Sequence, residues 1–303
     1  MTDDTVKKSN GIKNIFVGSK GLRAGWGVTL FFAVLTAALF GMVMVLRMFL
    51  KHSPNMDVMT PGLTTAYEGI QASVVLVVTL ITAAIERRSL ARLGFGLKNA
   101  LPRFLQGLVV GVAALAALVG ALSVCGAIKL GAIALHGADV WRYGAEWGLA
   151  FLLVGLSEEL MFRGYLQQTL ARGLNFRWSA LIMGILFTLA HVQNKGETPI
   201  GLFIVFAAGA VLTYSVWRTG AMWWGIGFHA AWDWMQSFTF GVADSGHPAV
   251  DALMTSKPAG PDWLSGGSTG PEGSVLALVI LVLVAGIIHF TVKKPDTDLE
   301  VKW

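Results

Sequence analysis

The sequence predicts an all-α, polytopic integral membrane protein with about eight transmembrane helices and a central intramembrane cavity. Two totals indicate this class, because 54% of the 303 residues are hydrophobic and only 14% are charged. A soluble domain carries about 25% charged residues. The third observation is that long apolar runs alternate with short polar or basic segments along the chain. The composition therefore favours helices that face lipid.

Charged residues, glycine or proline bound each of the expected spans. In chain order these spans cover residues 24–46, 63–85, 104–126, 145–172, 178–194, 200–217, 219–240 and 274–292. The first exceeds the length of a signal-peptide core and has no clear cleavage site, so we interpret it as uncleaved. Span 145–172 would reach roughly 42 Å. Glu68 and Gln71 fall near the start of the second span, where we expect an interfacial position.

The spans divide the chain into four parts. These are a basic N-terminus (1–23), a membrane-embedded helical domain (24–240), a flexible loop rich in Gly, Pro, Ser and Asp (241–273), and a last span with its tail (274–303). Most of the 23 Lys and Arg residues lie on the side of the two termini. The positive-inside rule then predicts cytoplasmic termini and an extracytoplasmic loop, in a plasma membrane such as the bacterial inner membrane.

Two adjacent glutamates, Glu158 and Glu159, follow an apolar run with no turn signal between. A charge at membrane depth costs a few kcal/mol or more when unpaired, so such residues are usually functional. Arg163 lies four residues after Glu159, so the two share a helix face and can pair. Glu158 points about 100° away and lacks such a neighbour. We therefore expect Glu159 and Arg163 to be mainly structural and Glu158 to be functional.

Three further polar residues, His191, His229 and Asp233, lie within apolar spans at a depth similar to that of Glu158. His229 and Asp233 are four residues apart and share a face, and Phe187 is related to His191 in the same way. Each alone could be a core residue or a helix anchor. Several costly groups at one depth instead indicate a shared functional site.

These patterns resemble the motifs of the CAAX protease and bacteriocin-processing (CPBP, Abi) family of intramembrane proteases, and of its type II CAAX prenyl endopeptidases. The family's Glu-Glu-x-x-x-Arg, Phe-x-x-x-His and His-x-x-x-Asn motifs correspond to Glu158, Glu159 and Arg163, to Phe187 and His191, and to His229 with Asp233 in the last place. The motifs occur in order within residues 145–240.

The resemblance implies an intramembrane endopeptidase with its core at 145–240. Glu158 would activate a water molecule, and His191, His229 and Asp233 would position or stabilise the intermediate, supported by Glu159, Arg163 and Phe187. The residues themselves permit this chemistry. Apolar surroundings strengthen Glu158 as a base, His191 can orient the water, and donors from span 219–240 can hold an oxyanion.

We expect no metal cofactor. Zinc accepts His and carboxylate ligands, and Glu158, His191 and His229 would be its ligands if it were bound. The sequence has no His-Glu-x-x-His pair, however, and each candidate ligand is a single residue on a separate turn. The metal-free reaction is therefore favoured.

Asp233 departs from the family pattern, which has asparagine there. An ionised aspartate cannot donate a hydrogen bond to an oxyanion, whereas asparagine can. We expect Asp233 to pair with His229 and keep the imidazole cationic, so that His229 becomes the main donor. The other possible consequence is weakened or lost protease activity.

Other functions stay open. The chain could be a catalytically weak or inactive immunity or scaffold protein, or a proton-coupled transporter with a Glu–His relay, although repeated halves are not visible. The expected partners are the lipid bilayer and a membrane-associated peptide or protein substrate. Nucleic acid is not expected, because loop charge accounts for the net charge of +5. The single Cys125 excludes an intramolecular disulfide and a Cys-based metal site.

Overall fold

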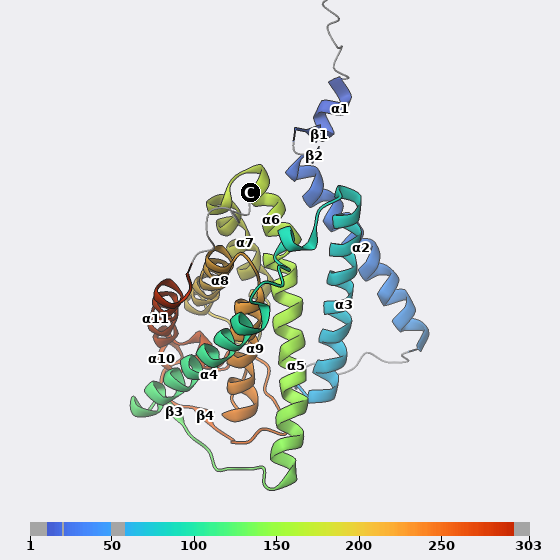
Figure 1. Cartoon of the computed structure of the whole chain (residues 1–303). Coiled ribbons are helices and arrows are strands. Elements are labelled where there is room, and N and C mark those ends of the chain that lie inside the picture. The colour runs from blue at the N-terminus through green and yellow to red at the C-terminus, as the bar shows by residue number, and fades with distance from the viewer. Residues whose placement is uncertain (1–10, 20, 50–57, 294–303) are drawn as a thin grey trace, which may run out of the picture.

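The computed structural model describes residues 11–19, 21–49 and 58–293, and this part of the chain is mainly helical (Figure 1). In chain order its elements are α1 (Gly11–Phe16), β1 (Val17–Gly18), β2 (Gly21–Leu22), α2 (Ala24–Phe49), α3 (Pro61–Glu86), η1 (Leu90–Leu93), α4 (Ala100–Val124), β3 (Ile128–Lys129), α5 (Ala138–Arg163), α6 (Tyr165–Gly173), α7 (Phe176–His191), α8 (Pro199–Thr219), α9 (Trp223–Trp234), the π-helical turn η2 (Met235–Thr239), β4 (Lys257–Pro258), α10 (Asp262–Ser265), η3 (Pro271–Gly273) and α11 (Val275–Thr291).

Long apolar helices account for most of the described chain. By length and composition, four helices in the described ranges can cross a membrane, namely α2, α3, α4 and α8, and α7 and α11 are shorter apolar helices. With α5, and with α9 extended by η2, they correspond to the eight predicted spans. The chain is thus an all-α, multi-pass membrane protein.

The long helices α3 and α8 begin with the same local signal. Thr60 Oγ1 accepts a hydrogen bond from Leu63 N at 3.3 Å, and Thr198 Oγ1 accepts one from Gly201 N at 3.0 Å. A proline follows each threonine, in the first helical turn, where no backbone N–H is needed. These caps fix where the helices start and hence the depth of the side chains that follow.

The span predicted at 145–172 is not one helix. Helix α5 begins earlier, at Ala138, and it ends at Arg163, because Gly164 adopts a non-helical conformation with ψ −126°. A Cβ atom at Gly164 would overlap with the carbonyl of Leu160, so this turn requires glycine. The following helix, α6, packs against α2 and α7. The two glutamates therefore lie near the end of α5, followed by a break.

The segment 241–273, expected to be a flexible loop, is folded onto the helices. Its strand β4 pairs with β3, Gly246 N donates to Thr269 O at 3.0 Å, and the Thr269 hydroxyl donates to Gly196 O at 2.9 Å. Gly246 has φ +82°, which only glycine adopts readily. The composition does produce turns, as expected, but these turns pack over one end of the helices.

Basic side chains gather at the other end of the bundle. There Arg172 pairs with the buried Glu86 at 2.9 Å and donates to Leu22 O, and Arg218 donates to His289 O at 2.7 Å. The Lys and Arg residues of the segments at this end are Arg23, Arg87, Arg88, Arg92, Lys98, Arg103, Arg172, Arg177, Arg218 and Lys293. The two ends therefore differ in charge as the sequence predicts.

Helix α9 packs closely against α4 through glycine. A Cβ atom at Gly107 would overlap with the carbonyl of Trp224, and one at Gly227 would overlap with the carbonyl of Phe104. The absence of side chains lets the two backbones touch. On the other side of α9, His229 faces α5, where its Cβ would lie 3.5 Å from a Cβ added at Gly155.

Candidate active site

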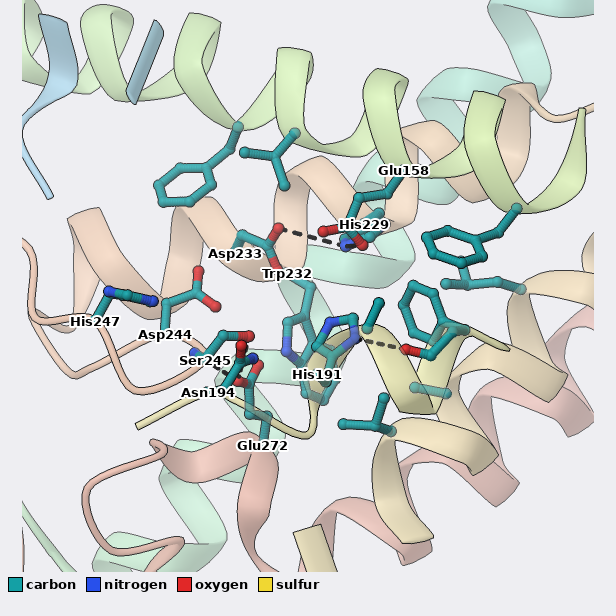
Figure 2. Close-up of a pocket in the computed structure, with 18 of the residues that line it drawn as sticks. Glu158, His191, Asn194, His229, Trp232, Asp233, Asp244, Ser245, His247 and Glu272 are labelled. Carbon is teal, nitrogen blue, oxygen red and sulfur yellow. Dashed lines mark hydrogen bonds and ion pairs between the residues drawn. The ribbon is translucent and has the colours of Figure 1, made fainter. Parts of the chain in front are cut away.

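The predicted catalytic residues line one cavity of about 490 Å³. Its wall is formed by α3, α5, α7, α8, α9 and α11 together with segment 241–273. The ionisable and polar side chains on the wall include Glu158, His191, Asn194, His229, Asp233, Asp244, Ser245, His247 and Glu272 (Figure 2). Glu68 of α3 also lines it. The expectation that Glu158, His191 and His229 share a cavity agrees with this arrangement.

Glu159 and Arg163 form the ion pair that their spacing predicts. Arg163 Nη1 donates to Glu159 Oε1 at 3.0 Å, and both side chains are fully buried. Arg163 Nη2 also donates to the carbonyl of Gly209 at 3.2 Å. The cation lies 4.4 Å from the ring centroid of Phe187. Buried charges are tolerated when paired and hydrogen-bonded, as here, so this pair ties α5 to α7 and α8.

Phe187 also contacts His191, one helical turn further along α7. The two ring centroids are 4.6 Å apart, and His191 Nδ1 lies 2.8 Å from the Phe187 carbonyl oxygen. A carbonyl oxygen can only accept, so Nδ1 carries the proton of this hydrogen bond. The Nε2 atom of a neutral His191 is then left as an acceptor, and the residue lines the cavity (Figure 2).

His229 contacts three carboxyl groups. Its Nδ1 lies 3.3 Å from Glu159 Oε1, and its Nε2 lies 3.7 Å from Glu158 Oε2 and 3.6 Å from Asp233 Oδ2. The contact with Asp233 is the one expected from their spacing. A Cβ at Gly225 would lie only 3.0 Å from Glu159 Oε2, so glycine leaves room for this carboxylate beside α9. The imidazole thus links the buried ion pair to the cavity.

Glu158 differs from Glu159 in its surroundings. Its side chain is 24% exposed, whereas that of Glu159 is 0% exposed. Among the described residues, Glu158 Oε2 has no hydrogen-bond partner. The distance of 3.7 Å to His229 exceeds that of a hydrogen bond. Because the side chain is partly exposed and lines the cavity, the Glu158 carboxyl group is within reach of a molecule there.

Glu68 and Gln71 of α3 are half-buried against α5, and the interfacial position that we expected for them stays a prediction. Glu68 Oε2 is 2.7 Å from Ser157 Oγ, and Gln71 Nε2 is 3.3 Å from the same carboxyl oxygen. Both residues also line the cavity. Their sequence position gives depth along α3 but not which helix α3 packs against. The contact with α5 is a tertiary feature that local spacing does not reveal.

Segment 241–273 adds Asp244, Ser245, His247 and Glu272 to the wall, and sequence patterns single out none of them. Burial raises the pKa of the Asp244 carboxyl well above its usual value, and the nearby Asp233 carboxylate raises it further. Burial likewise raises the pKa of Glu272, against hydrogen bonds from Ser245 N and Oγ at 2.7 and 3.1 Å. This end of the cavity is therefore rich in carboxyl groups.

Glu158, His191 and His229 are the residues that we expected to ligate a metal ion if one were bound. In residues 11–19, 21–49 and 58–293, no group of three or more His, Cys, Asp or Glu side chains is arranged to hold a metal ion. The absence of a metal cofactor nevertheless stays a prediction.

The motifs fall within a region that matches a known family. Residues 140–235, from α5 to the start of η2, match the family model described as Type II CAAX prenyl endopeptidase Rce1-like. No curated protein and no solved structure gave a significant match to the chain. The family match covers all three motifs and confirms the predicted resemblance. Residues 140–235 of this membrane protein are therefore similar to the Rce1-like type II CAAX prenyl endopeptidases, which supports assignment to the CAAX protease family.

Proposed function

We propose that the chain is an intramembrane endopeptidase that hydrolyses a peptide bond in an apolar or membrane-associated protein or peptide. Glu158 is the base that activates the attacking water. One observation carries the proposal: Glu158 Oε2 and His229 Nε2 face each other at 3.7 Å on the wall of a cavity that His191 also lines. A carboxylate base beside an imidazole donor suits water activation and oxyanion stabilisation.

The reaction begins when Glu158 removes a proton from water. The hydroxide oxygen bonds to the carbonyl carbon of the peptide, whose oxygen becomes an oxyanion. The intermediate then collapses, the carbon–nitrogen bond breaks, and the nitrogen leaves as an amine after receiving a proton. Glu158 can accept the water proton because it lines the cavity and because its Oε2 atom has no hydrogen-bond partner among the described residues.

His229 is the proposed oxyanion donor. A cationic imidazole has a proton on each nitrogen. Its Nδ1–H would donate to Glu159 Oε1 at 3.3 Å. Its Nε2–H is directed between Asp233 and Glu158, at distances longer than a hydrogen bond, and can turn to an oxyanion. Three neighbouring carboxyl groups favour this cationic form, which supports the role of Asp233 as a positioning residue.

His191 is the proposed water-orienting residue. Its Nδ1–H is held by the Phe187 carbonyl at 2.8 Å, which sets both the tautomer and the ring orientation. Its Nε2 can then accept a hydrogen bond from the attacking water. The proposed mechanism uses no metal ion, so a chelator should leave activity unchanged.

The basic end of the bundle is proposed to face the cytoplasm of a plasma membrane, with both chain termini on that side. The positive-inside rule supports this orientation. Segment 241–273 and the acidic end of the cavity would then face outward. A reporter enzyme fused after Trp303 that is active only outside the cytoplasm would contradict it.

The function can be tested with the purified protein in lipid vesicles. Two internally quenched peptides serve as probes, a farnesylated peptide ending in a CAAX sequence and an apolar transmembrane peptide. Wild type should cleave at least one of them, and Glu158→Gln should not. Glu146→Gln is a matched control, because Glu146 also lies on α5 but is exposed and paired with Arg142.

Comparison of membrane peptides from cells that express wild type or Glu158→Gln extends the test to natural substrates. Equal peptide sets, together with an unchanged cellular phenotype, would instead support an immunity or scaffold role. Proton flux into the vesicles that Glu158→Gln abolishes, without any cleavage, would support a transporter.

A further inference from the structure

Glu68 is a half-buried acidic residue that the proposed mechanism does not use. It lies seven residues after Pro61, on the order of 10 Å along α3. An ionised carboxylate within an apolar span is costly unless a cation pairs with it. Helix α3 has no Lys, Arg or His within one turn of Glu68. Its position in the cavity wall therefore needs an explanation other than an ion pair.

The hydrogen bonds around Glu68 fit a neutral carboxylic acid. Ser157 Oγ lies 2.7 Å from Glu68 Oε2 and 3.0 Å from the carbonyl oxygen of Val154. The hydroxyl has one proton, and the carbonyl can only accept. When Ser157 donates to Val154, the short contact to Glu68 requires a proton on the carboxyl group.

The opposite assignment is less favourable. If Ser157 donated its proton to an ionised Glu68, the charge would be held only by neutral groups, the hydroxyl of Ser157 and the amide of Gln71 at 3.3 Å. Burying a charge without a cation costs more than burying a neutral acid that is hydrogen-bonded. The absence of a paired cation among the described residues thus favours the protonated form.

Other ionisable groups lie near Glu68 on its own helix and on the helices around it. Glu158 of α5 and His229 of α9 interact with it electrostatically. Helix α2 packs on α3 as well, and its described residues carry one ionisable side chain, Arg47, in the last turn. Tyr67 precedes Glu68 on α3 itself. The negative charge of Glu158 opposes a second carboxylate, whereas a cationic His229 would favour one. The His229 imidazole nevertheless lies within ion-pair distance of Glu158 itself, at 3.7 Å.

The two cavity glutamates therefore have different partners. Glu158 faces the imidazole of His229, which can carry a positive charge, whereas Glu68 faces a neutral hydroxyl and a neutral amide. An ionised Glu68 would therefore have no cation paired with it among the described residues. Two carboxyl groups whose surroundings separate their protonation states are typical of an acid–base pair. We propose that Glu68 is the general acid of this site and donates its proton to the leaving amine. This inference rests on the proposed function, because it names the acid that acts with Glu158.

The proton balance closes over one turnover. Glu158 takes one proton from water, and the resulting hydroxide adds to the carbonyl carbon. As the carbon–nitrogen bond breaks, the nitrogen takes the proton of the Glu68 carboxyl group, which becomes a carboxylate. The proton on Glu158 then passes to Glu68 through water in the cavity. One water is consumed, and both glutamates return to their starting states.

A spectroscopic test needs no substrate. Infrared difference spectra of wild type and Glu68→Gln in lipid vesicles near neutral pH should show loss of a carboxylic-acid C=O band in the variant. Glu146→Gln should keep that band and lose carboxylate bands instead, because Glu146 is exposed and paired. Loss of carboxylate bands in Glu68→Gln would overturn the proposal.

A kinetic test separates the acid from a purely structural group. Glutamine retains a donor for Ser157, so Glu68→Gln should fold as wild type does. Its kcat for the quenched peptides should fall by about 10²-fold, with little change in KM and with loss of the alkaline fall in the pH profile. A 4-nitrophenyl ester of the same acyl segment, whose leaving group needs no proton, should be hydrolysed within a few fold of the wild-type rate.

The outcomes distinguish the two proposals. If wild type cleaves and Glu158→Gln does not, but Glu68→Gln matches wild type in kcat and pH profile, the acid role is wrong and the protease stands. If wild type and Glu158→Gln are equally inert, the proposed function fails, and the infrared spectra still decide the protonation state of Glu68.

Discussion

Helix α5 presents two neighbouring glutamates to two different environments. On its closed side, Glu159 is fully buried, paired with Arg163 and packed beside Gly225. On its open side, the Glu158 side chain is 24% exposed. Its Oε2 atom, like Glu159 Oε2, has no hydrogen-bond partner among the described residues. Residue type and membrane depth are the same, so partners alone account for the difference. The comparison teaches that a buried carboxylate with an arginine partner supports structure, whereas a carboxylate on a cavity wall without an arginine partner is available for chemistry.

The largest effect is expected from Glu158→Gln on the open side. Removal of the base should lower peptide cleavage by about 10³-fold, which corresponds to about 4 kcal/mol of transition-state stabilisation. The melting temperature in detergent should stay close to that of wild type. The reason is that Glu158 Oε2 makes no hydrogen bond to the described residues that the substitution could remove. Parallel cleavage and thermal-melting assays check both parts, and retained cleavage would break the comparison.

On the closed side, Arg163→Met should affect stability. It leaves the Glu159 charge buried and without its cation, which costs about 3–5 kcal/mol. Denaturant titration in detergent micelles measures this loss. The double variant Glu159→Gln/Arg163→Met should recover most of it, because no charge is then left uncompensated. A single variant as stable as wild type would mean that the closed side is not a structural pair.

Asp233→Asn is expected to have a smaller effect, on pH dependence. The aspartate lies 3.6 Å from His229 Nε2 and favours the cationic ring. Without its charge, His229 should lose its proton at lower pH, so cleavage at the alkaline end should fall about tenfold while the optimum moves toward acid. Cleavage rates measured across pH check this, and a profile identical to that of wild type would argue against the coupling.

The smallest effect concerns the outer end of the cavity. Burial raises the pKa of Asp244 in the folded state, so the folded protein binds more protons than the unfolded chain. Stability is then highest below the unfolded carboxyl pKa of about 4, and it falls as pH rises toward the folded pKa. Asp244→Asn should weaken this dependence, changing the melting temperature by a few degrees. Melting curves from acidic to alkaline pH measure it, and equal slopes for both proteins would contradict it.

Much of the site could be predicted from the sequence because it depends on local spacing. Glu159 and Arg163 pair at i and i+4, His229 contacts Asp233 with the same spacing, and His191 contacts Phe187. The apolar spans also gave the fold class, because lipid-facing helices need long apolar runs. These features require only the helix repeat and the membrane thickness.

Other features depend on tertiary packing and could not be predicted. Glu68 reaches the cavity only because α3 lies against α5 at Ser157. Asp244 and Glu272 reach it because segment 241–273 folds back over the helices, although its composition indicates turns alone. The break at Gly164 depends on the absence of a Cβ atom that would overlap with the Leu160 carbonyl, whereas the apolar run continues through it. The spacing of residues along a helix predicts none of these three tertiary features.

The glycine contacts between α4 and α9 have a consequence for mutational tolerance. A methyl group at Gly107 or Gly227 would push two backbones apart and roll α9 about its long axis, which would swing the His229 ring away from Glu158. Alanine at either position should therefore impair turnover although neither residue touches a reacting atom. The orientation of the His229 imidazole thus depends on the glycine contacts that α9 makes with α4.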